Sequence, residues 1–163
     1  MENAINEIKE MRLEIDGYFN LMGNLDRSRE ISIAITSAQN GKMWLGQTLK
    51  HMGNENPYPE SKNPDNEKIE PTADSSKGKA IDVLAMENQP PYSELSHIQK
   101  IKLLRLKITA IAENFEKPNL KVGVSSVSEL LQLSLVNAYT NILESNMWLG
   151  MELGRVFREQ ENK

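Results

Sequence analysis

The stretch Met43-Trp44-Leu45-Gly46 recurs as Met147-Trp148-Leu149-Gly150, 104 positions later, and the two copies hold the only two tryptophans of the chain. The same offset superposes Ala34 on Ala138, Thr36 on Thr140, Leu49 on Leu153, Ile31 on Leu135, Ala38 on Ile142 and Met52 on Val156. This repetition indicates an internal duplication.

Each copy of the motif lies in a segment whose apolar residues recur at helical spacing. They are Ile31, Ala38, Leu45 and Met52 in the first copy, and Leu135, Ile142, Leu149 and Val156 in the second. Between these rows the chain keeps small groups, Ala34 and Gly41 in one copy and Ala138 and Ser145 in the other. We therefore expect two long helices that approach a neighbouring helix closely, because no bulky side chain holds it away.

Length and composition favour a small protein that associates. A chain of 163 residues divided into two units leaves each unit with little buried surface, so association is expected. The chain has no cysteine, leader-like start, lipidation signal or long apolar run, which favours a soluble cytosolic protein without a membrane partner. The net charge of -4 argues against binding to a nucleic acid polymer, while a local basic site stays open.

The pattern predicts an all-α protein with two antiparallel helical hairpins. The expected helices run from Met1 to about Phe19, from about Arg27 to Met52, from about Glu94 to Phe115 and from about Ser126 to Arg158. Asp26 or Ser28, and Ser93 or Ser96, are the expected N-caps, and Gly53-Asn54 ends the second helix. The hairpins occupy residues 1–53 and 92–163 and assemble into a homo-oligomeric bundle.

Residues 54–91 join the two hairpins and hold six of the seven prolines, which predicts a Pro-rich, acidic linker. Within it, residues 56–59 suit a polyproline-like elbow and residues 80–86 suit a short helical turn.

The usual signatures of an enzyme are missing. There is no phosphate loop, no glycine-rich dinucleotide turn and no cysteine nucleophile, and the two histidines, His51 and His97, are far apart in sequence. Asp65, Glu67, Glu70 and Asp74 lack the glycine that a calcium loop needs at its sharp turn. We expect a protein without catalysis, cofactor or metal.

The segment from Leu95 to Ala112 carries Lys100, Lys102, Arg105 and Lys107 and no acid. Lys100 and Lys107 lie on one flank of its apolar face and Arg105 on the other. Such an edge can hold phosphate oxygens by charge-assisted hydrogen bonds. Spacing alone gives more weight to the alternative, in which the lysine stems simply cover apolar surface. The tryptophans are likewise more often core or interface residues than ligand contacts.

The residues around this segment resemble the phage anti-CBASS cyclic-nucleotide sponges. In that family a Tyr-x-x-Leu segment leads into a helix that ends in an Asn-Glu-Ile-Lys-like tetrapeptide. This chain has Tyr92-Ser93-Glu94-Leu95-Ser96 followed by Leu104-Arg105-Leu106-Lys107, and the first unit has Asn6-Glu7-Ile8-Lys9 verbatim. Further similar residues are Asp26, Arg27 or Arg29, Ile33, Ala34, Thr36, Gly41 and Met43. The Met-Trp pair is closer to the related anti-Thoeris sponges.

The resemblance implies a non-catalytic protein of the host cytoplasm that sequesters cyclic di- or trinucleotide immune signals at subunit interfaces. It implies that Tyr92 stacks on a base and that Lys107 meets the phosphate. Further candidate ligand residues are Arg105, Lys100, Asn146, Trp148 and Lys9. Each chain carries two hairpins and so resembles a dimer of hairpins. An assembly of six hairpins would need three chains, so we predict a trimer of these pseudo-dimers, with a dimer as the alternative. Where the family carries a basic residue for a second site, this chain has Gln47 and Met151.

Three other functions stay open. Cyclised ADP-ribose signals of Thoeris offer bases and phosphates to the same groups. A helical scaffold would use the duplication for assembly alone, and a nucleic-acid-binding regulator would use the cationic helix on phosphates.

Overall fold

The computed structural model describes residues 2–53, 91–118, 120 and 129–162, and all regular elements in these ranges are helical. The α-helices are α1 (Glu2–Met22), α2 (Arg29–His51), α5 (His97–Glu113) and α7 (Glu129–Glu161). Two 3-10 turns, η3 (Tyr92–Glu94) and η4 (Asn114–Glu116), flank α5. The predicted all-α class is confirmed. The elbow at 56–59, the turn at 80–86 and the linker up to residue 90 lie outside the described residues.

Local capping sets the starts of two helices. The Ser28 hydroxyl accepts from the Ile31 amide at 3.1 Å, which satisfies a free N–H at the start of α2. Ser96 and Gln99 form a capping box at the start of α5, where each side chain bonds the other residue's backbone N–H. Gly53 follows α2 with a φ of 90°, a left-handed conformation that a side chain would disfavour. These caps agree with Ser28, Ser96 and Gly53 as predicted.

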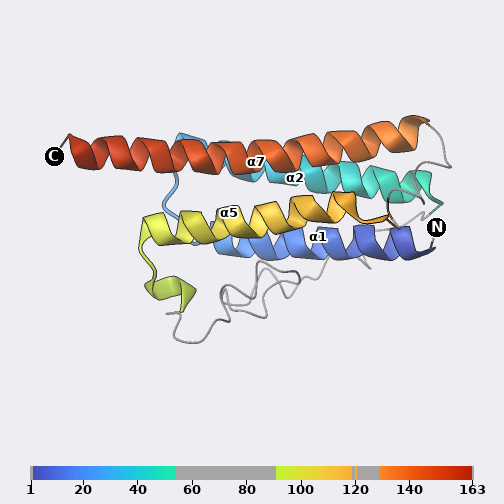
Figure 1. Cartoon of the computed structure of the whole chain (residues 1–163), viewed down its shortest axis with the longest axis horizontal. Helices are drawn as coiled ribbons and strands as arrows, with labels where there is room; N and C mark the ends of the chain where they lie inside the picture. The colour runs from blue at the N-terminus through green and yellow to red at the C-terminus, as the bar shows by residue number, and fades with distance from the viewer. Residues whose placement is uncertain (1, 54–90, 119, 121–128, 163) are drawn as a thin grey trace.

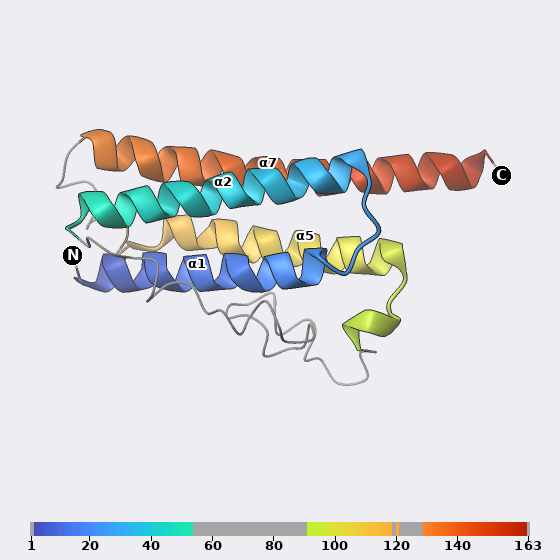
Figure 2. The same cartoon turned by 180° about the vertical axis from the view of Figure 1, so that it is seen from behind.

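The four α-helices form a bundle in which each helix runs antiparallel to the helices beside it (Figures 1 and 2). Helix α1 lies beside α2 and α5, and α7 lies beside the same two helices on the opposite side of the bundle. The largest contact is between α2 and α7, the two helices that carry the Met-Trp-Leu-Gly motif.

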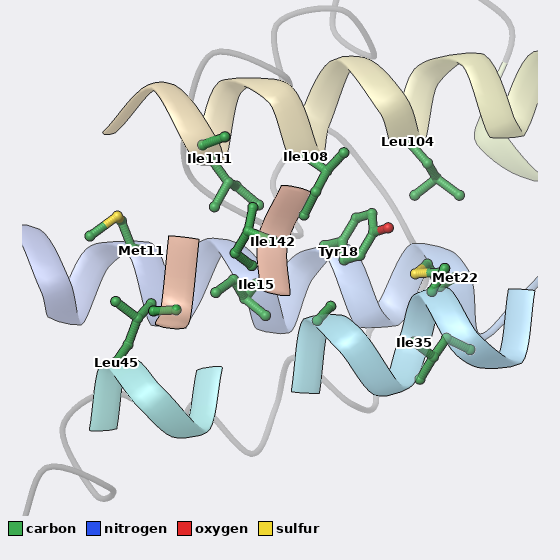
Figure 3. Packing of buried hydrophobic residues seen from close by; sticks show 14 of the residues in the cluster. Met11, Ile15, Tyr18, Met22, Ile35, Leu45, Leu104, Ile108, Ile111 and Ile142 are labelled. Atoms are coloured by element: carbon green, nitrogen blue, oxygen red, sulfur yellow. The ribbon is translucent and has the colours of Figure 1, made fainter. Parts of the chain in front are cut away.

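Figure 3 shows the core between the four helices, with Ile15 of α1, Ile108 of α5 and Ile142 of α7 meeting at its centre. In each motif the leucine is fully buried, the tryptophan is half-buried and the methionine is exposed. The two tryptophans therefore lie at the edge of the core rather than at its centre.

The duplication is visible in the structure as pairs of equivalent contacts between α2 and α7, in which each copy contributes the residue that the other copy contacts. A Cβ added to Gly41 would lie 3.3 Å from the Ala138 carbonyl oxygen. At the equivalent position of the other copy, the Ser145 hydroxyl donates to the Ala34 carbonyl at 2.7 Å. Because Ala34 and Ala138 are themselves equivalent, α2 and α7 are related by an approximate two-fold axis. The close approach predicted from the small residues is present.

Gly41→Leu is expected to lower the free energy of unfolding by about 1–3 kcal/mol, as overpacked core substitutions do. The reason is that a Cβ at residue 41 already lies 2.9 Å from the Ile142 Cδ1 atom. Urea unfolding followed by circular dichroism measures the loss. Asn40→Leu, on the exposed face of the same helix, is the control and should stay within about 0.5 kcal/mol of wild type. Equal stability of the two variants would contradict the close packing.

Candidate functional site

The candidate site is a groove of about 430 Å³ between α5 and α7. Its lining residues are Lys102, Arg105, Leu106, Thr109 and Leu153. Four of these five come from α5, where spacings of three and four residues bring them to one face. The groove therefore combines two cations, one hydroxyl and two leucines.

Arg105 is held in place across the groove by α7. Its Nε donates to the Asn146 Oδ1 atom at 3.0 Å, and the Asn146 Nδ2 atom donates to the Thr109 hydroxyl at 3.2 Å. A Cβ at Gly150 would lie 3.3 Å from the guanidinium carbon, so the guanidinium rests directly over that glycine. This fixes the side chain while its other N–H groups remain donors of the planar fork that suits phosphate.

The electrostatics of α5 favour an anion on this side. Residues 97–112 contain Lys100, Lys102, Arg105 and Lys107 and no Asp or Glu. Two of these four cations, Lys102 and Arg105, line the groove, so the groove is positively charged on an acidic chain.

Lys107 does not face the groove. It is 2% exposed and lies between α5 and α1, where it is electrostatically coupled to Glu14. Burial, partly opposed by the attraction of Glu14, lowers the pKa of Lys107 to about 8. Burial also raises the pKa of Glu14 to about 7, although Lys107 and a hydrogen bond from Asn114 oppose it. Lys107 here is half of a buried charge pair.

Tyr92 is also part of the core, 3% exposed, and its hydroxyl donates to the Leu21 carbonyl at 2.8 Å. The Lys100 Nζ atom lies 5.3 Å from the centre of the Tyr92 ring, within the range of a cation–π contact. Lys100 also lines a second, small cavity of about 160 Å³ with Asn24, Leu25, Asp26 and His97. Neither ring face of Tyr92 is open to a base on the surface of this chain.

The remaining candidates are separate from the groove. Trp148 is half-buried on α7, and the Arg29 guanidinium lies 5.7 Å from its ring centre. Lys9 is half-buried on α1, on the opposite side of the bundle from α7. Of the seven predicted ligand residues, only Arg105 lines the groove, and Asn146 is hydrogen-bonded to it from α7.

A second polar cluster forms around Glu152, which is fully buried. Its carboxylate accepts from Ser28, the N-cap of α2, and from Arg155, and lies 3.3 Å from the His97 Nε2 atom. Burial raises its pKa, but hydrogen bonds from Arg155, Ser28 and His97 outweigh burial and hold the pKa below its usual range. Ser28 bonds the carboxylate rather than the imidazole, so this trio is not a nucleophile activated by a base. It joins α2, α5 and α7.

Sequence reasoning missed Lys102, Leu106, Thr109 and Leu153 as members of one site. The spacing of the first three on α5 could have grouped them with Arg105. The spacing does not show which of the two cationic flanks of α5 stays open to solvent. That depends on which helix packs on each side of α5. Helix α1 covers the Lys107 flank, and α7 lies along the Arg105 flank and leaves a groove there.

Among the described residues, no helix is long and apolar enough to cross a membrane. Within the same ranges, no three His, Asp or Glu side chains gather as metal ligands would. Comparison with protein-family models, curated proteins and solved structures finds no match.

Proposed function

We propose that this protein is a phage anti-defence sponge that binds cyclic di- or trinucleotide immune signals in the host cytoplasm and holds them without cleaving them. By lowering the free signal it would keep CBASS-type effectors inactive. The observation that carries the proposal is the α5–α7 groove, in which Arg105 is held by Asn146 beside Lys102. The resemblance to the sponge family supplies the class of ligand.

The chemistry of the groove suits such a ligand. Arg105 and Lys102 supply charge-assisted donors for phosphate oxygens. The Asn146 amide and the Thr109 hydroxyl can donate to and accept from the edge of a base, and Leu106 and Leu153 offer apolar surface to the ring or the ribose. A volume of about 430 Å³ falls in the usual range of roughly 300–1,000 Å³ for ligand pockets.

A sponge needs abundance and tight binding, not turnover. Nanomolar affinity takes about 12 kcal/mol, which is more than one open groove supplies when its ligand keeps one face in water. We therefore include assembly in the proposal: the two hairpins and the Pro-rich linker form one protomer of a homo-oligomer, as a trimer or a dimer, in which a neighbour encloses the ligand. The groove on one chain is then part of a larger site.

The test is thermal unfolding of the purified protein against cyclic dinucleotides, cyclic trinucleotides and ADP-ribose derivatives. A ligand that binds only the folded state adds RT ln(1 + [L]/Kd), about 2.7 kcal/mol at a hundredfold excess over Kd. We expect a clear rise in Tm with a cyclic di- or trinucleotide, and intact ligand after denaturation. A rise only with ADP-ribose products would assign the Thoeris signal instead. No rise with any of them would leave a helical scaffold, and a cleaved ligand would mean an enzyme.

A further inference from the structure

Helix α7 carries large apolar side chains on a face that no described part of this chain covers. Leu133, Val136, Leu143, Met147, Met151 and Phe157 are each 42–58% exposed, and we call them the apolar stripe. Isolated exposed leucines are ordinary, but a continuous row along one helix marks an interaction surface.

The duplication provides an internal control for this stripe. At the equivalent positions of α2 the chain has Arg29, Ser32, Gln39, Met43 and Gln47, so only the methionine is apolar in both copies. Both helices occupy equivalent places in the same bundle, and α2 shows that polar residues suffice there. The stripe is therefore not a requirement of the fold and needs a separate explanation.

The spacing of the stripe identifies the kind of partner. Val136, Leu143, Gly150 and Phe157 follow one another at intervals of seven, and so do Leu133, Thr140, Met147 and Gly154. Two such rows, three residues apart, form the seam of a two-stranded coiled coil, in which the partner is a helix with the same repeat. Within the described residues, α7 itself is the helix that has this repeat.

The small residues of the seam fix the direction of pairing. Parallel pairing in register would set Thr140, Gly150 and Gly154 each on its own copy, which leaves three holes. Antiparallel pairing about an axis near residue 148 sets Phe157 against Thr140 and Leu143 against Gly154, so the paired part of the seam runs from residue 140 to residue 157. Large residues then fill the space over small ones, as close packing requires.

The dimensions also suit a second copy. Helix α7 has 33 residues, against 23 in α2 and 17 in α5, and its C-terminal end projects past its neighbours (Figure 1). From Leu133 to Phe157 the stripe runs roughly 36 Å at 1.5 Å per residue.

We infer that the apolar stripe of α7 pairs antiparallel with the same stripe of a second copy of this chain, forming a two-fold dimer. The pairing gives the homo-oligomer of the proposed function a specific surface and selects the dimer over the trimer. Leu106, which lines the ligand groove, lies on α5 next to this surface and is itself exposed. The dimer therefore brings a second α7 alongside each groove.

The first test exchanges stripe residues for their equivalents in α2, giving Leu133→Arg, Val136→Ser, Leu143→Gln and Met151→Gln in one chain. Sedimentation equilibrium should show a wild-type protein of twice the chain mass and a monomeric variant with unchanged helix content by circular dichroism. Leu130→Asp copies Asp26 onto an exposed position of α7 outside the stripe and should keep the dimer. A wild-type mass of one or three chains, or a variant that keeps the wild-type mass, overturns the inference.

The second test uses the absence of cysteine from the chain. Met147→Cys, near the axis, should cross-link efficiently to itself with a short bis-maleimide. Phe157→Cys should not cross-link alone but should do so when mixed with Thr140→Cys. Self-cross-linking of Phe157→Cys would overturn the antiparallel arrangement. The thermal-shift measurements with the nucleotide panel are made on the wild-type dimer and on the monomeric variant separately. The mass reports failure of the dimer, and the absence of a thermal shift in the wild type reports failure of the proposed function.

Discussion

Lys107→Glu is expected to destabilise the protein by about 3–5 kcal/mol, the usual cost of leaving a charge buried without a partner of opposite sign. The substitution would place a second carboxylate opposite Glu14 in a site where Lys107 is 2% exposed and Glu14 is buried. Because small domains are stable by only about 5–15 kcal/mol, this loss is a large fraction of the total stability. Urea unfolding followed by circular dichroism measures the effect.

The reversed pair, Glu14→Lys with Lys107→Glu, should recover most of this loss because opposite charges again face each other. Lys102→Glu is the matched control on the exposed face of α5 and should change stability by less than about 0.5 kcal/mol. If Lys107→Glu proved as stable as Lys102→Glu, Lys107 would have to reach water, and the buried pair would be wrong.

The same pair sets a pH dependence. The raised pKa of Glu14, about 7 instead of 4.5, means that its contribution to stability is complete below pH 4.5 and is lost as the pH rises through 7. The lowered pKa of Lys107, about 8 instead of 10.5, means that its contribution is complete above pH 10.5 and is lost as the pH falls through 8. Glu14→Gln with Lys107→Met should remove both slopes and leave stability at pH 7.5 equal to or above wild type.

Loss of nucleotide binding in Lys107→Glu would not by itself identify a ligand contact. A variant that unfolds loses every ligand, whether or not residue 107 touches it. The reversed pair separates the two causes, because it restores the fold while keeping a carboxylate at position 107. Retention of ligand by the reversed pair would mean that Lys107 is structural.

The positions of the helices could be predicted because the signals are local. Ser28, Ser96 and Gly53 act within one turn of themselves, and apolar spacing within each segment determines which face is buried. The close approach at Gly41 was also predictable, since the duplication repeats a small residue, Ser145, at the same place. Fold class follows from such patterns without knowledge of the packing partners.

The candidate site was only half predictable, because it depends on tertiary packing. Both flanks of α5 carry cations, and the sequence does not say that α1 buries the flank of Lys107 while α7 leaves the flank of Arg105 in a groove. The resemblance implies that Tyr92 stacks on a base, yet its ring is buried in the core and its hydroxyl donates to the Leu21 carbonyl. On α7 apolar residues occupy more than one face, so periodicity predicted the helix but not which apolar row would remain exposed.

Arg105→Glu is expected to weaken nucleotide binding by about a hundredfold or more while leaving the fold intact. The reason is that the guanidinium is the one cation of the groove fixed by α7, through Asn146, and reversing its charge removes donors and repels phosphate. A loss of about 3 kcal/mol corresponds to that factor. Arg105→Lys should lose about tenfold, because a lysine keeps the charge but not the planar fork.

Isothermal titration with the nucleotide that gives the largest thermal shift measures these losses. Arg27→Glu is the matched control, since Arg27 is exposed in the turn between α1 and α2 and makes the same change of net charge away from the groove. A general electrostatic effect of the acidic chain would weaken binding equally in both variants, whereas a specific site in the groove weakens it only in Arg105→Glu. Equal affinities of the two variants would place the ligand elsewhere. Selective loss in Arg105→Glu, with the Tm of the unliganded protein unchanged, would locate the phosphate between α5 and α7, because no other described cation is anchored there.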